Sequence, residues 1–488
     1  MADHNVLFVC CALLLALPLA CARAKAGEVI DVGSRLELFV DDHLVDKLKG
    51  ASRVLHRPTE REVAIALGEP WEGNNCGYVT VFQDGDVYRM YYRGRHLDLS
   101  KGTLAFPHAQ VYCYAESRDG VHWTKPNLGL VEFNGSKKNN IILEGAGTHN
   151  FTPFKDPNPA CKPSARYKAL GGEGGGLVAF KSTDAIHWKP IRNKPVITKG
   201  AFDSQNLAFW DSVRGEYREY HRGFRQGRDV MTCTSKDFVT WTEPKWLDYT
   251  PDRLTQLYTN QITPYARAPH IFLGFPARYI AGRGLLTPLN RRIASVSRRC
   301  GTDYSDTGFI TSRNATRFDV WPEAFIRPGI VEAGRWVYGD NYVNWGLVET
   351  KSDLPGTPPE LSLYSTEGCW REAMSLRRYT IRLDGFVSVA APFKGGELLT
   401  KPIKFAGKEL VLNYATSAAG SVRVEIRDVE GKPIPGYTLR DCPEIFGDSV
   451  GQVVAWKGGS DVSKLAGKPV RLRFVLKDAD LYSIQFRP

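Results

Sequence analysis

The sequence has little of what marks several common functional classes. It contains no block of Lys and Arg, although 64 such residues against 53 Asp and Glu give a formal charge of +11. Nucleic-acid binding usually relies on a concentrated basic face, so this dispersed charge predicts no nucleic-acid partner. There is also no P-loop, no GxGxxG after a strand, no HExxH and no GxSxG, which argues against the chemistries that those motifs carry.

Cysteine is neither abundant nor closely spaced. Three of the ten cysteines precede residue 27, and those beyond it form no C-x-x-C and no close Cys/His pair. The pattern therefore predicts no structural zinc site and no metal-ligating residues. In an exported protein one or two disulfides are compatible with this count, and the other thiols would be buried. The cysteines concerned are Cys76, Cys113, Cys161, Cys233, Cys300, Cys369 and Cys442.

Long apolar runs are absent except at the start, where residues 6–20 are apolar and Ala22-Arg23-Ala24 follows. This run is shorter than the about 20 residues that a membrane-spanning helix needs. We interpret residues 1–26 as a signal peptide and expect export to the periplasm or the medium, although the segment before the run lacks Lys and Arg. "PLAC", ending at Cys21, leaves a lipoprotein anchor as a minority alternative.

What the sequence does contain is a repeat. "CYAESRDGVHWTKP", "VAFKSTDAIHWKPI" and "VMTCTSKDFVTWTEP" share a strand, a Ser or Thr, an acidic turn and a Trp, and "FITSRNATRFDVWPE" is a degenerate copy. Each copy follows a Tyr-rich run of alternating character, which is typical of half-buried antiparallel strands. Asp119, Asp184 and Asp237 fall in the turns of this repeat, so we assign them a structural role.

The repeat predicts an all-β fold in which small sheets are arranged around an axis and bury one another's faces. Residues 27–393 are predicted to form a five-bladed β-propeller of about 70 residues per blade, larger than compact propeller repeats. A series of β-sandwiches with chance Ser/Trp matches is the alternative. Residues 394–488 alternate cleanly without the repeat and are predicted to form a C-terminal β-sandwich.

Carboxylates near the predicted inner strands are the candidate catalytic groups. Glu72, Asp156 and Asp203 occupy related places in the first three blades, and glycoside cleavage needs one carboxylic acid and a second carboxylate. Each also has a structural interpretation: "KDPNP" around Asp156 is good turn chemistry, Asp203 fits a turn cap, and Glu72 fits a solvated loop.

Aromatic and polar residues near the same strand ends are predicted to bind substrate, through ring faces and through hydrogen bonds to hydroxyl groups. His149 and Arg267 are equally compatible with structural roles. The predicted substrate-binding residues are Trp71, His149, Asn150, Gln205, Asn206, Tyr258, Asn260, Gln261, Arg267, Asp340 and Glu349; Trp210 and Trp345 offer further ring faces.

With these motifs, the chain resembles the five-bladed propeller glycosidases, namely the invertase/inulinase group (family 32) and the arabinanase/xylosidase group (family 43), as a divergent member. "KDP" at Lys155–Pro157 is similar to the Arg-Asp-Pro element of the invertase group, which implies that Asp156 binds substrate hydroxyls and supports the transition state. The first-blade Asn-Asp-Pro and third-blade Glu-Cys motifs of that group are missing, with Glu72 and Asp203 standing in those regions. The resemblance therefore does not imply sucrose or fructan as substrate.

The sequence predicts an exported glycoside hydrolase that acts on a poly- or oligosaccharide. A glycan phosphorylase with an Arg/His phosphate site, a lyase using His149, Tyr258 and Arg267, and a sugar-binding propeller without catalysis remain the alternatives. No cofactor is required, although oxygen ligands in the central channel are compatible with Ca²⁺. The predicted partner is a carbohydrate; the sequence leaves the oligomeric state open.

Overall fold

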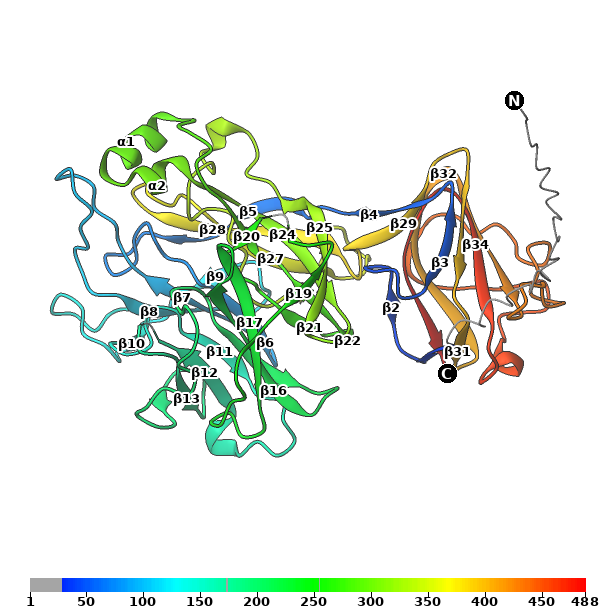
Figure 1. Cartoon of the computed structure of the whole chain (residues 1–488), viewed down its shortest axis with the longest axis horizontal. Helices are drawn as coiled ribbons and strands as arrows, with labels where there is room; N and C mark the ends of the chain where they lie inside the picture. The colour runs from blue at the N-terminus through cyan, green and yellow to red at the C-terminus, as the bar shows by residue number, and fades with distance from the viewer. Residues whose placement is uncertain (1–28, 173, 254) are drawn as a thin grey trace, which may run out of the picture.

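The computed structural model describes residues 29–172, 174–253 and 255–488. The predicted signal peptide, residues 1–26, lies outside these ranges. The described chain is nearly all β and folds into two lobes of unequal size (Figure 1). The larger lobe carries the repeat and has a propeller-like arrangement.

Four antiparallel sheets of the larger lobe form the blades. In order along the chain, three are built from consecutive strands, and the last is completed by β5 from near the start of the described chain. The first blade contains β6 (Thr80–Asp84), β7 (Val87–Gly94), β8 (Val111–Ser117), β9 (Trp123–Thr124) and β10 (Ile141–Glu144). The second contains β11 (Thr152–Lys155), β12 (Tyr167–Gly171), β13 (Val178–Ser182) and β14 (Lys189–Pro190). The third contains β15 (Leu207–Asp211), β16 (Glu216–Phe224), β17 (Arg228–Ser235) and β18 (Lys245–Trp246). The last contains β26 (Val348–Thr350), β27 (Glu360–Glu367), β28 (Met374–Arg382) and β5 (Thr59–Leu67).

The prediction of five blades is wrong in number, because the described chain has four blades and one broader sheet. The segment expected to be the fourth blade forms a seven-stranded sheet in which β19 pairs with β25 in parallel and the β24–β25 register is shifted. Its strands are β19 (Asp248–Thr250), β20 (Gln256–Leu257), β21 (Thr263–Tyr265), β22 (Ala268–Gly274), β23 (Ala277–Ile280), β24 (Tyr304–Ser312) and β25 (Arg317–Ile326). Helices α1 (Pro288–Val296) and α2 (Arg298–Thr302) are inserted between β23 and β24. Short 3₁₀ turns occur at η1 (Pro163–Ala165), η2 (Val331–Ala333) and η3 (Ser463–Leu465).

Shared apolar cores hold the sheets together around the lobe. One core joins the first and second blades, and another joins the second and third blades to the seven-stranded sheet. A third joins that sheet to the last blade, and a fourth joins the last blade to the first. Each sheet thus buries its faces against two neighbours, as the repeat predicted.

The repeated Ser and Asp residues have the structural role that we assigned to them. Ser182 donates to Asp184 at 3.0 Å and accepts from the backbone N–H of Ala185 at 2.9 Å. The same pair of bonds recurs at Ser117 and Ser235, and at Ser312 with Asn314 in place of Asp. These bonds fix a tight turn after β8, β13, β17 and β24, which explains the sequence repeat.

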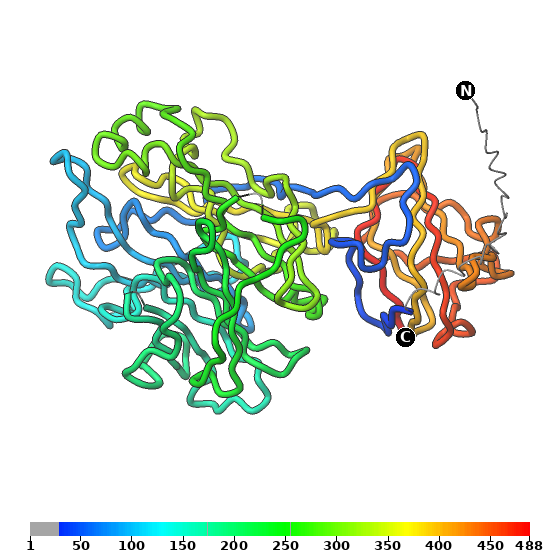
Figure 2. The backbone as a smooth tube through the Cα atoms, in the orientation of Figure 1, coloured from blue at the N-terminus to red at the C-terminus, as the bar shows by residue number. Residues whose placement is uncertain are grey.

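The smaller lobe contains an eight-stranded sheet and a two-stranded sheet. Strands β2, β3 and β4, which belong to the segment assigned to the propeller, pair here with C-terminal strands. The chain therefore crosses between the lobes near β4–β5 and again near β28–β29, as the tube in Figure 2 shows. A β-sandwich domain at residues 394–488 stays a prediction. The strands are β1 (Ile30–Gly33), β2 (Glu37–Leu38), β3 (Val45–Lys49), β4 (Ser52–Leu55), β29 (Val387–Ala391), β30 (Gly396–Thr400), β31 (Ile403–Phe405), β32 (Glu409–Arg427), β33 (Asp448–Val453) and β34 (Arg471–Arg487).

Two further predictions can be compared with the described residues. No helix in those ranges combines the length and the apolar character that a membrane crossing requires. The cysteines from Cys76 to Cys442 are free thiols, all buried except Cys161, so the described part of the chain contains no disulfide.

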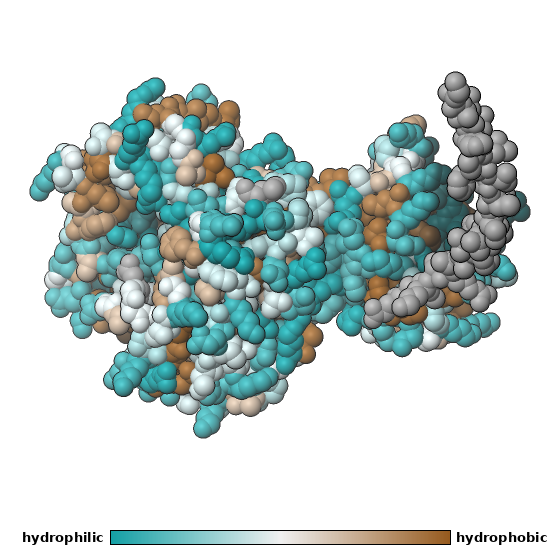
Figure 3. Space-filling view, in the orientation of Figure 1, coloured by the Kyte–Doolittle hydropathy of each residue, from teal (hydrophilic) through white to brown (hydrophobic). Residues whose placement is uncertain are grey.

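The face drawn in Figure 3 is mainly hydrophilic, with scattered apolar patches.

Candidate functional site

Asp203 is the predicted catalytic carboxylate that reaches open space. It lies just before β15, its side chain is 56% exposed, and its Oδ1 is 2.8 Å from Nε2 of the buried His149. His149 Nδ1 lies 3.0 Å from Oε1 of Gln110, so the imidazole ring is oriented by a contact on each side. Partial burial favours a higher pKa for Asp203, but the hydrogen bond from His149 and the charges of His149, Arg222 and Arg93 lower it. Asp203 is therefore ionised at neutral pH.

Tyrosines line the cavity of about 180 Å³ that contains Asp203. The hydroxyl of Tyr78 lies 3.2 Å from that of Tyr258 and 3.5 Å from Asp203 Oδ1. Tyr338 and Tyr342 also line this cavity and pack edge-on or tilted against Tyr258. Burial raises the pKa of both Tyr78 and Tyr258, so their hydroxyls stay protonated. Rings with polar tips can contact a sugar face and its hydroxyl groups together.

A buried arginine forms a long ion pair with the carboxylate. Arg222 on β16 is 5% exposed, and its Nη2 is 3.9 Å from Asp203 Oδ2. Its Nε has no hydrogen-bond partner among the described residues, and its guanidinium lies 4.9 Å from the centroid of the Tyr258 ring. Leaving a buried guanidinium nitrogen without a hydrogen bond is costly.

Arg93 on β7 is a second arginine near Asp203 and lines the cavity. It donates to Asn75 Oδ1 at 2.7 Å, and its guanidinium covers the ring of Tyr78 at 4.7 Å. The structure thus gathers one exposed carboxylate, a histidine, four tyrosines and at least two arginines at the starts of the inner strands.

Sequence reasoning missed these arginines and Tyr78, yet a signal for the arginines was present. Both follow an aromatic pair and precede glycine at the end of a second strand, in "YYRG" of the first blade and "YHRG" of the third. Comparing the repeats beyond their turns would have shown the match.

Glu72 is placed away from Asp203 as a buried structural acid. Its side chain is 0% exposed and accepts hydrogen bonds from Lys125 at 2.7 Å and Tyr92 at 2.5 Å. Burial raises its pKa against the opposing effect of Lys125. The neighbouring Trp71 donates its indole N–H to Asn140 at 2.7 Å.

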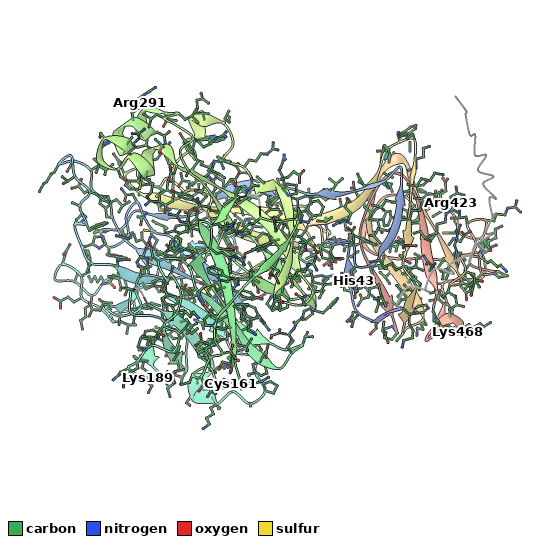
Figure 4. All side chains as sticks on the ribbon, in the orientation of Figure 1. His43, Cys161, Lys189, Arg291, Arg423 and Lys468 are labelled. Atoms are coloured by element: carbon green, nitrogen blue, oxygen red, sulfur yellow. The ribbon has the colours of Figure 1, made fainter. Side chains whose placement is uncertain are left out.

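Asp156 is also fully buried and lies at the opposite ends of the inner strands, directly after β11. It pairs with Lys168 and accepts a hydrogen bond from Tyr217 at 2.6 Å, while its Oδ1 accepts the backbone N–H of Asn158 at 2.9 Å. Cys161, at the lower edge of the larger lobe in Figure 4, contacts the same lysine. The local geometry is that of a turn residue, and a catalytic role for Asp156 or Glu72 is an untested prediction that these contacts do not favour.

The predicted amide ligands form a buried network near the Asp203 end. Gln261 donates to Gln205 Oε1 at 2.8 Å, and Gln205 donates to the Val79 carbonyl at 3.0 Å. Asn150 and Asn206 both donate to the carbonyl of Ser204 at 2.9 Å. Asn260 accepts the backbone N–H of Ile262 at 3.2 Å, and all of these side chains are almost completely buried. In this arrangement they position the loop that carries Asp203.

Asp340 is buried beneath the same cavity. Its Oδ1 accepts the backbone N–H of Cys369 at 2.8 Å, and its Oδ2 has no partner among the described residues. Desolvation raises its pKa to about 8, even though backbone N–H groups oppose the shift. Asp340 is therefore mostly protonated at neutral pH.

The remaining predicted ligands line a separate cavity of about 710 Å³ at the Asp156 end. Arg267 donates to Asp384 Oδ1 at 2.9 Å and lies 4.0 Å from Glu349, while Trp345 donates to the Ile262 carbonyl at 3.0 Å. Trp210 lines this cavity as well. A cavity of about 820 Å³ lies elsewhere on the seven-stranded sheet, around Arg253. The Asp203 cavity is smaller than both, but it holds the exposed carboxylate in contact with a histidine.

No known protein-family profile matches the chain. Uncharacterised proteins from two strains of Mycobacterium tuberculosis are each 48% identical to it over 169 residues, which are 33% of this chain and 48% of theirs. The chain thus spans about half the length of these curated relatives.

Similar solved structures include one described as a glycoside hydrolase, at 15% identity and a TM-score of 0.42 over 67% of this chain and 92% of that one. A deacetylase of N-acetylgalactosamine from F. plautii matches at 12% identity and a TM-score of 0.41, over 69% of this chain and 96% of that one. A β-1,2-mannobiose phosphorylase from Listeria innocua matches at 10% identity and a TM-score of 0.41, over 69% of this chain and 97% of that one. None of these three is described as a member of families 32 or 43, so that resemblance stays a prediction.

Proposed function

We propose that the chain is a carbohydrate-active enzyme that cleaves a glycosidic bond in the tyrosine-lined cavity, with Asp203 as the group that exchanges a proton with the reactants. The observation that carries this proposal is the contact of 2.8 Å between the exposed carboxylate and the buried His149. A proton-transfer group must be accessible to substrate and held in one orientation, and this pair meets both conditions.

The protonation state of Asp203 indicates its role in the reaction. Because the pKa of Asp203 is lowered, the resting carboxylate is ionised and suited to accept a proton from an attacking nucleophile. His149 Nε2, 2.8 Å from Asp203 Oδ1, is suited to hold the carboxylate in one orientation. Most glycosidases use a second carboxylate; Glu72 and Asp156 are buried and paired with lysines, so we assign neither of them to that role.

Phosphorolysis is a second candidate, favoured by the buried Arg222. A phosphate ion as nucleophile removes the need for a carboxylate that activates water, and it needs a cationic site beside the proton-transfer group. Arg222, with Nη2 3.9 Å from Asp203 Oδ2 and an unpartnered Nε, is suited to that task.

A glycan panel assayed with and without inorganic phosphate tests the proposal. Wild-type protein is expected to release reducing sugar, and Asp203→Asn is expected to lower kcat by about 10²–10⁴-fold, the usual share of a proton-transfer group. Asp252→Asn, which changes an exposed carboxylate at a different cavity, should retain full activity. Sugar phosphate formed only with phosphate present would identify a phosphorylase.

Saturable glycan binding without release, unchanged by Asp203→Asn, would contradict the proposal and leave a sugar-binding propeller. The proposal also includes export of the chain and a ring in which the seven-stranded sheet takes the place of a fifth blade. The closed series of shared cores supports this last point.

A further inference from the structure

Three side chains of metal-ligating type meet inside the third blade and have no role in the proposed reaction. Glu219 and His221 are two residues apart on β16 and so share one face of the strand. Cys233 on β17 lies directly opposite Glu219 in the antiparallel register. One ligand atom from each residue lies within 4.8 Å of the other two, and within the described ranges this is the group of three that could hold a metal ion.

We propose that Glu219, His221 and Cys233 bind one Zn²⁺ ion. The set combines a thiolate, an imidazole and a carboxylate, which are the three side-chain types that zinc takes in proteins. Hard cations such as Ca²⁺ and Mg²⁺ prefer oxygen ligands alone, so the cysteine and histidine argue against them.

The short distances within the cluster are compatible with ligands around a single ion. Glu219 Oε2 lies 2.7 Å from His221 Nδ1 and 3.4 Å from Cys233 Sγ. Ligand bonds of about 2.0–2.3 Å place neighbouring ligand atoms about 3–4 Å apart, so the 3.4 Å distance already fits a shared ion and the 2.7 Å distance needs to lengthen by a few tenths of an ångström.

The burial of the cluster calls for a compensating charge. The Glu219 and His221 side chains are 0% exposed and Cys233 is 3% exposed. Glu219 Oε1 and His221 Nε2 have no hydrogen-bond partner among the described residues, and the ion pair found for Glu219 there is with His221. A carboxylate in such surroundings is costly unless a cation balances it.

Binding exchanges a proton for the metal. Cys233 is a buried free thiol in the metal-free chain. Zn²⁺ binding replaces the thiol proton with a Zn–S bond and releases one H⁺ to solvent. No oxidant or reductant takes part.

The segment beside His221 packs closely on its ring and connects the cluster to the proposed active site. At Gly200, a Cβ atom would stand 2.5 Å from His221 Cδ2 and 2.6 Å from Nε2, so any larger residue would displace the imidazole. The ring of Phe202 also packs on His221, with 5.2 Å between centroids. Residues 200–203 end at Asp203, so the ion stabilises the segment that presents this carboxylate.

Metal analysis and cobalt substitution of the full chain test the proposal. Protein purified without chelator is expected to contain about one zinc per chain, and the metal-free protein should develop thiolate-to-cobalt charge-transfer absorption on addition of Co²⁺. Cys233→Ser should lose the absorption and at least nine-tenths of the zinc. Cys442→Ser is the matched control, because Cys442 is equally buried at 3% exposed but belongs to the smaller lobe, and it should behave as wild type.

A wild-type chain that holds no zinc after growth with added zinc, and that gives no thiolate absorption with Co²⁺, would overturn the proposal. The wild-type measurement decides this even if Cys233→Ser fails to fold. Loss of zinc from the control as well would also overturn it, because the metal would then not depend on this cluster.

Discussion

At the scale of single residues, the structure separates three acidic side chains that the sequence left equivalent. Asp203, Asp156 and Glu72 each lie near the end of an inner strand, but the latter two are fully buried against Lys168 and Lys125. These lysines come from other strands or loops, so the residues next to each acid in the sequence do not predict the ion pair. Sequence reasoning could therefore propose the carboxylates, while tertiary packing decides which of them reaches solvent.

The buried Asp340 leads to a prediction about pH. Its pKa is about 8 in the folded chain against 3.8 for an ordinary aspartate, because desolvation disfavours the charged form. The protonated carboxyl stabilises the fold fully below about pH 4, and this contribution is lost as the pH rises towards 8. Four pKa units correspond to about 5 kcal/mol as an upper limit.

We expect Asp340→Asn, which cannot ionise, to gain stability relative to wild type as the pH rises from 5 to 8.5. The comparison is the difference in free energy of unfolding between the two proteins, measured in urea at each pH. Groups common to both proteins cancel in this difference. A difference that does not change with pH would show that Asp340 is not protonated in the fold.

At the scale of elements, the repeat predicted most of the hairpins and the turns that close them. Its Ser and Asp residues bond as the recurring pattern requires, and three of the repeat copies lie in regular blades. The fourth copy, at Ser312, keeps the turn but lies in the seven-stranded sheet. The repeat predicts a β-hairpin but not how many further strands join its sheet. For this reason the predicted number of blades was wrong.

Gly120 in the first of these turns tests how closely adjacent blades approach. Its φ is +72°, and a Cβ atom would stand 2.8 Å from Thr350 Cγ2 of the last blade. Gly85, with φ of +65°, has nothing within 4 Å of the same position. Both alanine variants carry backbone strain of about 1–2 kcal/mol, but only Gly120→Ala adds overpacking of about 1–3 kcal/mol.

Urea unfolding of Gly120→Ala and Gly85→Ala therefore measures the blade contact as the difference between them. Gly120→Ala is expected to lose more free energy of unfolding than Gly85→Ala. Equal losses would mean that the first and last blades are not in contact at this turn.

At the scale of the whole molecule, the division into lobes does not follow the order of the chain. The sequence pattern changed at about residue 393, but strands β2 to β4 join the smaller lobe and β5 completes the last blade. Long-range pairing of this kind depends on partners more than 300 residues away, as between β5 and β28. Alternation within each strand could not predict it, because alternation gives the buried face of a strand but not its partner.

An ion cluster between the lobes supplies the last prediction. Arg313, in the turn between β24 and β25, contacts Glu37 at 2.7 Å and Asp41 at 2.6 Å, and Figure 4 places the nearby His43 on the side of the smaller lobe that faces the larger one. Burial alone would raise the pKa of Glu37, but His270 and Arg313 outweigh it and lower the pKa to about 2.

Replacing Arg313 with Met leaves two buried carboxylates without their guanidinium, so we expect a loss of about 3–5 kcal/mol at pH 7. The part of this loss due to Glu37 depends on its charge, which is present in the unfolded chain only above about pH 4.5. The difference in free energy of unfolding between wild type and Arg313→Met should therefore become smaller as the pH falls from 4.5 towards 2. Lys404→Met removes an exposed pair with Asp31 and should cost much less than Arg313→Met. Equal losses of free energy of unfolding in the two variants at pH 7 would mean that Arg313 does not join the lobes through these carboxylates. The same conclusion would follow if the difference between wild type and Arg313→Met did not change with pH.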